Sequence, residues 1–488
     1  MLFNSIDFAV FLPVVFLIYW FVTNKSLKLQ NLLIVVASYV FYGWWDWRFL
    51  LLIIFSTLVD YLIGIFLSKI DDKFKRKLLL WTSIAVNLGF LGFFKYYNFF
   101  LDNFISAFSL FGMEIRASSL SIVLPVGISF YTFQTLSYTI DVYKKKLEPT
   151  RDFIAFSAFV SFFPQLVAGP IERATNLLPQ FYKKRKFDYS QAVDGMRQIL
   201  WGLFKKIVIA DNCAIYANQI FNNSADYGGS TLVLGAVFFA FQIYGDFSGY
   251  SDIAIGTSRL FGFKLMQNFA FPYFSRDVAE FWRRWHISLS TWFRDYLYIP
   301  LGGSRGSRWA TVRNTFAIFI VSGFWHGANW TFIVWGVLNA LYFLPVLLTN
   351  NHRNNLDTVA EGKLLPSLKD TICVLSTFAL TLIAWVFFRA NNISHATSYL
   401  TDLFLGLDEY SHYYRSYRYI SIKMGYLMLS TLGLFVIVEW IGRHNLFAIE
   451  KLPFYQNKYA RYGFYYLIVS SIVYLSTGKP QEFIYFQF

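Results

Sequence analysis

The chain has 488 residues, of which 56% are hydrophobic and only 15% are charged. Soluble proteins carry roughly a quarter charged residues and need many polar side chains to cover their surface, so the composition argues against a soluble protein. The net charge of +14 is divided among short clusters between apolar segments. This distribution argues against nucleic-acid binding, which needs basic residues gathered on one face, and is typical of the cytoplasmic loops of membrane proteins.

The first apolar segment covers residues 8–22, after Asp7 and before Lys25. A removable signal peptide begins with basic residues and ends at small ones, and this segment does neither. We therefore predict a retained membrane helix with Lys25 on the cytoplasmic side.

Further apolar segments follow along the whole chain. A membrane helix needs about 20 apolar residues, and because several segments are shorter or interrupted we predict about ten to twelve helices. The polar stretches 351–369 and 390–419 have the length of loops, and no soluble domain can be separated, so residues 1–488 are predicted to form a single integral membrane domain. The segments centre on residues 8–23, 30–43, 49–69, 78–94, 121–141, 152–168, 195–221, 229–262, 312–324, 329–349, 370–389, 422–441 and 463–477.

The basic clusters give a consistent orientation up to residue 146, and then the alternation fails. A single span at 152–168 would place the basic cluster 183–186 outside the cytoplasm. This segment runs into FFPQLVAGPIER, and its Pro164 breaks a helix. Irregular backbone at membrane depth has to be covered by protein. We predict a re-entrant segment, with a kinked span as the alternative. The pair Lys205 and Lys206 is interpreted as another cytoplasmic cluster.

The stretch 241–263 places Asp246, Ser248, Ser251 and Asp252 within an apolar segment. Neither carboxylate has a local basic partner, and buried carboxylates need one or must be neutralised. They are predicted to orient a histidine, to pair with an arginine of 276–313 or to bind a cation. A purely structural polar cluster is an equal alternative.

Residues 272–313 are basic and rich in aromatic side chains, and these recur at helical spacing. Such an amphipathic stretch is suited to the membrane interface or to partial insertion. It ends in the glycine-rich turn 302–306. The turn lacks the G-K-[ST] ending of a phosphate loop. With Arg283, Arg284, Arg305, Arg308 and Arg313 it is nevertheless a candidate docking site for a cytoplasmic phosphate-bearing donor, unless it is an ordinary basic turn.

Residues 324–332 read FWHGANWTF and place His326 between two apolar segments. A charged group at membrane depth is costly, but a neutral imidazole keeps one hydrogen-bond donor and one acceptor. Trp325, Asn329 and Trp330 add polar hydrogens, so we predict a dry pocket that admits a polar reactant. A structural histidine between helices is the alternative. His286 is the second candidate, with an interfacial histidine as its alternative. No metal motif, catalytic triad elbow or dinucleotide fingerprint is present.

Long stretches of the sequence match a known family. The chain resembles the membrane-bound O-acyltransferases, in particular their bacterial alginate O-acetyltransferase branch, and more distantly the D-alanyl transferase of teichoic acid assembly. The matching stretches are LPVGISFYTFQTLSYTIDVY (124–143), FFPQLVAGPI (162–171), GDFSGYSDIAIG (245–256), FWRRWHISLSTWFRDYLYIPLGG (281–303), GFWHGANWTF (323–332) and WVFFRA (385–390), so the core motifs lie between residues 120 and 390.

The resemblance implies an all-α polytopic bundle with re-entrant segments and a central tunnel, in the bacterial cytoplasmic (inner) membrane. It implies that His326 is the catalytic histidine and His286 the second one. The implied reaction moves an acetyl group from a thioester, such as acetyl-CoA, towards hydroxyls of an extracytoplasmic polysaccharide. The implied partners are an SGNH-type acetyltransferase or a polysaccharide synthesis complex. No bound cofactor is expected. A transporter that uses the buried Asp and His residues as ion sites, or a non-catalytic scaffold, is the alternative.

Overall fold

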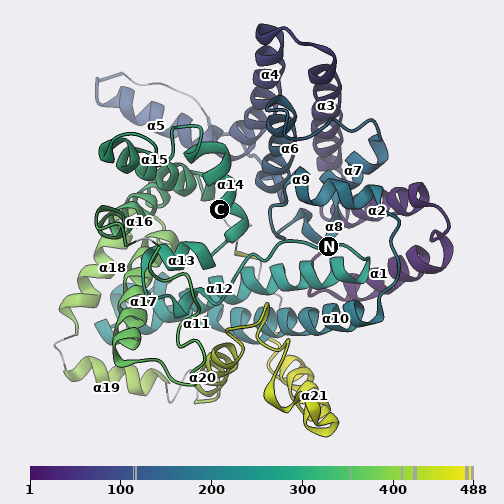
Figure 1. Cartoon of the computed structure of the whole chain (residues 1–488). Helices are drawn as coiled ribbons and strands as arrows, with labels where there is room; N and C mark the ends of the chain where they lie inside the picture. The colour runs from purple at the N-terminus through teal and green to yellow at the C-terminus, as the bar shows by residue number, and fades with distance from the viewer. Residues whose placement is uncertain are drawn as a thin grey trace. The chain divides into compact units, whose positions relative to one another are not determined.

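The computed structural model describes residues 1–113, 115, 118–351, 353–407, 410–420, 426–478 and 483–484. Every regular element in these residues is helical (Figure 1). The chain divides into two compact units, of which unit 1 comprises Met1–Gly195 with Thr257–Met266 and unit 2 comprises Met196–Gly256 with Gln267–Phe488. A single domain over 1–488 stays a prediction.

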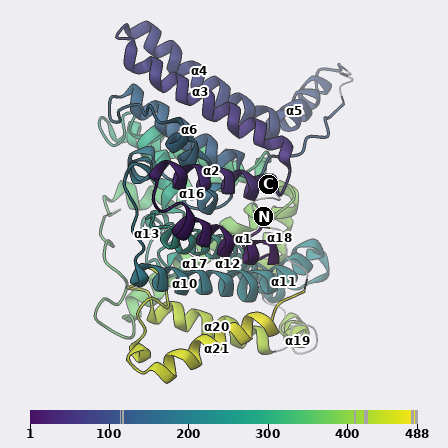
Figure 2. The ribbon, with the colours of Figure 1, turned by 90° about the vertical axis from the view of Figure 1, so that its right-hand side faces the viewer.

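Unit 1 contains the N-terminal helices. A buried polar cluster joins three of them, α3, α4 and α6, which lie side by side in Figure 2. The carboxylate of Asp60 on α3 accepts hydrogen bonds from Ser83 and Asn87 on α4 and from Thr139 on α6. Hydrogen bonds between helices are a favourable contact in a membrane, where burial of apolar surface cannot drive association. The elements are α1 (Ile6–Leu17), η1 (Ile18–Val22), α2 (Leu27–Gly43), η2 (Trp47–Phe49), α3 (Leu50–Lys69), α4 (Lys73–Leu91), η3 (Gly92–Tyr96), α5 (Tyr97–Ser109), α6 (Ile128–Tyr143), α7 (Phe153–Ser161), α8 (Phe163–Leu166), α9 (Ala174–Leu177) and η4 (Leu178–Tyr182).

The predicted irregular segment at 152–168 is a broken helix. Helix α7 ends at Ser161, and the short α8 begins at Phe163 with Pro164 in its first turn. All residues from Ala155 to Ile171 are buried, as irregular backbone in a membrane requires. At 1.5 Å per residue, α7 extends about 14 Å, which is less than the thickness of the hydrocarbon core. Whether the segment re-enters or crosses stays a prediction.

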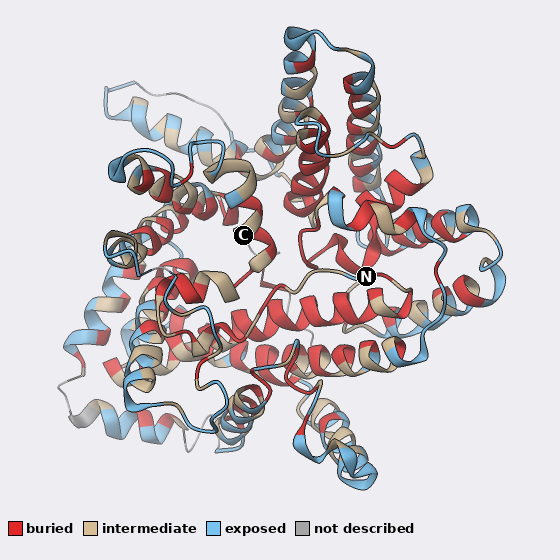
Figure 3. Cartoon of the chain, in the orientation of Figure 1, coloured by how far each residue is buried: buried red, intermediate tan, exposed pale blue. Residues whose placement is uncertain are grey.

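Unit 2 is built around α12 (Gly229–Leu260), which is buried along almost all of its length (Figure 3). Helix α12 and α10 (Tyr189–Leu203) contribute residues to both units. The other elements are η5 (Phe204–Ala210), α11 (Asp211–Asn222), η6 (Ser224–Asp226), η7 (Pro272–Phe274), α13 (Val278–Arg284), α14 (Ile287–Phe293), η8 (Arg294–Tyr298), α15 (Arg308–His326), α16 (Trp330–Leu348), α17 (Leu368–Arg389), α18 (Ile393–Leu405), α19 (Tyr410–Tyr419), α20 (Tyr426–Ile441), η10 (Pro453–Gln456) and α21 (Lys458–Tyr474).

Nine helical stretches of the described residues are apolar enough to lie in a membrane. Five are long enough to cross it, namely Trp47–Lys69, Lys73–Ser109, Gly229–Leu260, Trp330–Leu348 and Leu368–Arg389. The four shorter ones are Ile6–Val22, Leu27–Gly43, Phe153–Leu166 and Tyr426–Ile441. Many of their outward side chains are large and apolar, and only a bilayer can cover that much apolar surface. The chain is an all-α polytopic membrane protein.

The prediction of a loop at 390–419 is wrong, because this stretch contains α18 and α19. Helix α18 begins at the cap Asn392, whose side chain accepts a hydrogen bond from the backbone N–H of His395. Its buried residues Ala396, Tyr399 and Leu403 recur at helical spacing. The polar residues between them conceal this stripe when the stretch is judged by average polarity.

Two glycines allow α15 and α16 to approach closely. A Cβ atom added to Gly323 would lie 2.3 Å from the carbonyl oxygen of Phe332, and one added to Gly336 would lie 2.5 Å from that of Phe319. Both obstacles are backbone atoms, which cannot rotate away. Small residues serve this purpose in membrane helix pairs. The contact fixes the end of α15, where His326 lies.

Replacement of Gly336 by Ala is therefore expected to destabilise the protein by about 1–3 kcal/mol through overpacking. The measurement is the thermal unfolding midpoint of the purified protein in detergent. Gly433→Ala on α20 is the control, because its added Cβ meets nothing within 4 Å. An unchanged midpoint for Gly336→Ala would show that the two helices can separate without loss.

Candidate active site

His286 lies at the break between α13 and α14. Its backbone is left-handed, with φ 44° and ψ 53°, so it ends one helix and caps the next. The segment 268–270 runs alongside this break: Ala270 N–H donates to the carbonyl of Arg284, and Ile287 N–H donates to that of Asn268. The predicted amphipathic helix is thus two short helices. His286 is 1% exposed, so it is a core residue and not an interfacial one.

The imidazole of His286 is held on one side. Its Nδ1 lies 3.1 Å from Oδ1 of Asn268 and 3.4 Å from Oγ of Ser288. Its Nε2 is buried and has no hydrogen-bond partner among the described residues. Burial lowers the pKa of His286 to about 3, because desolvation disfavours the charged ring. The ring is therefore neutral at physiological pH.

His326 is the last residue of α15 and is 4% exposed. The helix stops there because Gly327 is extended and Asn329 caps the following α16. The His326 ring is 5.1 Å from the ring of Trp335 on α16 and 5.2 Å from that of Phe388 on α17, both in edge contact. Aromatic rings therefore pack against the imidazole, and the dry pocket that admits a polar reactant stays a prediction.

The ring of Trp325 connects the two histidines. It lies 6.3 Å from the His286 ring and 5.0 Å from the His326 ring. Behind His326, Trp335 stacks on Trp385 at 5.9 Å, and Trp385 lies 5.1 Å from Trp285, the residue before His286. Two histidines that are 40 positions apart in sequence therefore share one aromatic cluster.

A cavity of about 960 Å³ within unit 2 leads towards this cluster. Arg294, Arg308 and Arg353 line it, and all are exposed or largely exposed, so this end is its mouth. Its inner end is formed by Phe319 and Ser322, which are 9% and 7% exposed.

One face of α15 forms a wall of the cavity and continues towards His326. Thr311, Thr315, Phe319 and Ser322 line it at helical spacing, and His326 is four residues beyond Ser322 on the same face. Trp282 also lines the cavity, and its ring is 5.7 Å from that of Trp335. The cavity thus has a cationic mouth and an inner end, formed by an aromatic ring and a hydroxyl group, that stops one helical turn before the imidazole.

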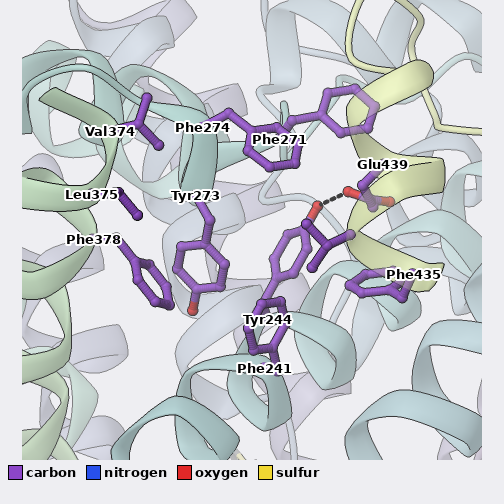
Figure 4. Close-up of a pocket in the computed structure, with 11 residues that line it drawn as sticks. Phe241, Tyr244, Phe271, Tyr273, Phe274, Val374, Leu375, Phe378, Phe435 and Glu439 are labelled. Atoms are coloured by element: carbon purple, nitrogen blue, oxygen red, sulfur yellow. Dashed lines mark hydrogen bonds between the residues drawn. The ribbon is translucent and has the colours of Figure 1, made fainter. Parts of the chain in front are cut away.

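A second cavity of about 180 Å³ has a different chemistry (Figure 4). Its lining is aromatic and aliphatic apart from the hydroxyl groups of Tyr244 and Tyr273 and the carboxyl group of Glu439. The hydroxyl of Tyr244 donates to Glu439 at 2.5 Å, that of Tyr273 donates to the carbonyl of Ala240, and the indole of Trp201 donates to Glu439. These polar groups are already satisfied, so the second cavity favours no polar reactant.

Of the predicted arginines, Arg283 and Arg308 line the large cavity. Arg283 also donates to the carbonyl of Asn355, and Arg308 donates to that of Leu348. Arg284 instead forms an ion pair with Glu280. Arg305 is exposed and is not part of the lining.

The flanking residues of His326 have mixed surroundings. The Asn329 side chain caps α16 by accepting from Thr331 N–H, and it donates to the carbonyl of Asn391. Trp330 is 50% exposed, whereas Trp325 is 5% exposed. Among these three residues, Trp325 is the one whose ring contacts both histidines.

The interpretation of Lys205 and Lys206 as an exposed loop cluster is wrong. They lie in η5, are 4% and 1% exposed, and neutralise the carboxylates of α12. Lys205 pairs with Asp252 at 2.5 Å, and Lys206 pairs with Asp246 at 2.7 Å. Partners 40 or more positions away cannot be recognised from sequence, and a short basic pair resembles a loop cluster.

Asp246 and Ser248 therefore have structural contacts. The second oxygen of Asp246 accepts the backbone N–H of Ile484 at 2.7 Å, and Ser248 donates to the carbonyl of Tyr244. The sequence argument missed Asn268, Trp282, Trp335 and Trp385. Trp335 and Trp385 stand in apolar runs, Trp282 stands beside two arginines of the basic stretch, and Asn268 precedes the histidine by 18 positions.

Comparisons with known proteins identify the family of the chain. Residues 147–363 match the sequence profile of the MBOAT, membrane-bound O-acyltransferase family. A probable alginate O-acetylase of Pseudomonas aeruginosa is 42% identical over 81% of this chain and 73% of its own length. A probable alginate O-acetylase of Pseudomonas putida is 37% identical over the full length of both chains. The peptidoglycan O-acetyltransferase of Helicobacter pylori is 36% identical over 83% of this chain and 80% of its own.

These similarities cover both the cavity and the segments that carry the two histidines. The high identity over most of both chains leaves little room for a different fold or a different reaction class. The chain belongs to the membrane-bound O-acyltransferase family and is an O-acyltransferase.

Proposed function

We propose that this enzyme moves an acetyl group from a cytoplasmic thioester, acetyl-CoA or a similar donor, towards hydroxyls of an extracytoplasmic polysaccharide. The route leads across the bacterial inner membrane, either to the polymer or to an SGNH-type partner acetyltransferase that modifies it. The alginate and peptidoglycan O-acetylases among the relatives support acetyl transfer. The observation that carries the proposal is the cavity with arginines at its mouth and His326 one turn beyond its inner end.

In the proposed reaction His326 acts as general base. It takes the proton of the incoming hydroxyl, whose oxygen attacks the thioester carbonyl carbon and forms the new C–O bond. The C–S bond breaks, and the departing thiolate takes the proton back from the imidazolium. General base catalysis contributes typically 10²–10⁴-fold. A transient acyl-imidazole on His326 is the alternative route.

The surroundings of His326 suit this chemistry. A dry aromatic site strengthens electrostatic interactions and excludes water, which would hydrolyse the thioester. Tryptophan N–H groups are candidates to stabilise the oxyanion. Asn329 is a weaker candidate, because its amide already donates to Asn391. Arg283, Arg308 and Arg353 line the cavity, and the affinity of guanidinium groups for phosphate supports their proposed role in holding the donor.

The ion pairs of two buried aspartates argue against the alternative that the protein is a transporter. It needs Asp246 and Asp252 as ion sites, but each is already paired with a lysine. The experiment that separates the two functions uses the purified protein in liposomes with radiolabelled acetyl-CoA. Release of free thiol supports acyl transfer. Movement of the label across the membrane without thiol release would overturn the proposal.

Closure of the cavity gives a second expected result. Ser322→Trp places an indole at the inner end, and we expect thiol release to fall about 10²-fold, because reacting groups that are displaced by an ångström lose that much. Val321→Trp is the matched control, since Val321 is the adjacent residue and is 42% exposed. Equal activity of both variants would mean that the donor does not use this cavity.

A further inference from the structure

Asn268 is a buried residue that has no role in the proposed reaction as described above. It is 0% exposed and lies beside the break that carries His286. Its Oδ1 atom is surrounded by three groups: the backbone N–H of Ser288 at 3.2 Å, Oγ of Ser288 at 2.8 Å and Nδ1 of His286 at 3.1 Å. Its Nδ2 atom lies 3.0 Å from Oγ of Ser251 on α12.

These contacts fix which way the amide points. A backbone N–H can only donate, so the amide atom that faces Ser288 has to be the oxygen. The nitrogen then points to Ser251, whose hydroxyl can accept. The assignment of oxygen and nitrogen in an amide follows from the hydrogen-bond network, and here one obligatory donor determines it.

The orientation of the amide in turn fixes the tautomer of His286. An amide oxygen only accepts, so Nδ1 of His286 has to carry the hydrogen. A neutral imidazole has one protonated and one unprotonated nitrogen, so Nε2 presents a lone pair. That Nε2 is buried and has no partner among the described residues.

Asn268 also supports an uncommon backbone conformation. Non-glycine residues rarely adopt positive φ, and such residues persist only where their surroundings hold them. The carbonyl of Asn268 accepts the N–H of Ile287 at 2.9 Å, and its side chain accepts the next N–H, that of Ser288. One residue thus holds both the backbone turn and the ring of His286.

We infer that Asn268 is a positioning residue that keeps His286 in the Nδ1–H tautomer, so that Nε2 accepts a hydrogen bond from the substrate. The recognised group is an N–H or O–H of the substrate, either an amide of the thioester arm or a hydroxyl of the acyl acceptor. Only the contact between Nε2 and the substrate rests on the proposed function; the position and tautomer of His286 do not.

The tautomer can be measured directly. In wild-type protein with ¹⁵N-labelled histidine, the His286 signals, assigned with His286→Gln, are expected to show a protonated Nδ1 and an unprotonated Nε2. A hydrogen on Nε2 would overturn the inference. This measurement needs no activity, so it stands even if acetyl-CoA proves not to be a substrate, an outcome that would refute the proposed function alone.

Two variants test the consequence for catalysis. Asn268→Ala removes the acceptor, and we expect kcat for thiol release to fall about 10²-fold at every pH, as for a misplaced catalytic group. Asn268→Asp keeps an acceptor for Nδ1–H and is expected to recover most of that loss at alkaline pH. Activity of Asn268→Asp equal to that of Asn268→Ala at all pH values would overturn the positioning role.

The aspartate variant should also gain a dependence on acid pH. The groups around the ring are Phe247, Phe269, Trp325, Asn268 and Ser288, none of which is charged. A new carboxylate would raise the pKa of His286, and protonation of Nε2 at low pH would remove the acceptor. We expect the fall in activity on the acid side to begin at a higher pH in this variant than in wild type, where only the general base is protonated. An unchanged pH profile in Asn268→Asp would contradict the inference.

Two KM values show which substrate donates the hydrogen bond to Nε2 of His286. A raised KM for acetyl-CoA in Asn268→Ala indicates the thioester arm, and a raised KM for glycerol, used as the hydroxyl acceptor, indicates the acyl acceptor. An unchanged kcat with both KM values unchanged overturns the inference. Gln267→Ala is the matched control, because the side chain of this neighbouring amide donates to the backbone carbonyls of Phe269 and Leu446 and not to the histidine among the described residues. It is expected to behave as wild type.

Discussion

Replacement of His326 by Ala is expected to abolish acetyl transfer while the protein remains in the membrane. The loss should be about 10²–10⁴-fold, which is the usual contribution of a general base. Gly323 and Gly336 bring α15 and α16 together independently of the imidazole, so we expect this helix pair to persist in the variant. The measurement is thiol release from radiolabelled acetyl-CoA, normalised to purified protein.

The matched control for this variant is His395→Ala. His395 lies in the first turn of α18, where its Nε2 lies 3.1 Å from the carbonyl oxygen of Phe221. It has no role in the proposed reaction, so activity should stay at the wild-type level. Retained thiol release in His326→Ala would refute the catalytic assignment. A loss in both variants would show instead that activity follows general damage.

The second large effect concerns stability. Lys206 lies 2.7 Å from Asp246 and 2.8 Å from Asp211, and it is 1% exposed. Lys206→Met leaves two buried carboxylates without their cation. Removal of one partner of a buried ion pair costs about 3–5 kcal/mol, because the remaining charge is uncompensated. We expect a lower yield in membranes and a lower unfolding midpoint.

A compensating variant shows whether Lys206→Met destabilises the protein through lost charge balance or through lost packing. Lys206→Met combined with Asp246→Asn and Asp211→Asn removes all three charges, and most of the stability should return. Lys369→Met at the exposed start of α17 is the control and should change little. If the triple variant is as unstable as Lys206→Met alone, the charge network does not explain the effect.

The sequence identified correctly what depends on composition and local pattern. The excess of apolar residues and the spacing of the basic clusters predicted a polytopic helical membrane protein, and the structure confirms it. Pro164 predicted the interruption at 152–168, since proline acts on its own backbone wherever it stands. The long motifs around His286 and His326 predicted the family, which the comparisons confirm.

Local polarity was a poor guide where long-range partners change the surroundings of a residue. Lys205 and Lys206 looked like loop residues, although carboxylates of α12 bring them into the core. The stretch 390–419 looked like a loop, although burial of Tyr399 and its neighbours makes part of it a packed helix. In both cases α12 supplies a stabilising partner that is far away in sequence.

By itself the sequence determined that the protein lies in a membrane, that it is helical and which reactive side chains it carries. These properties follow from composition and from contacts within one or two helical turns. The tertiary structure alone decided that one aromatic cluster joins His286 and His326, that a cavity approaches His326 along α15, and that Asn268 faces Nδ1 of His286. Such arrangements depend on contacts between segments whose order in the chain does not fix their distance in space.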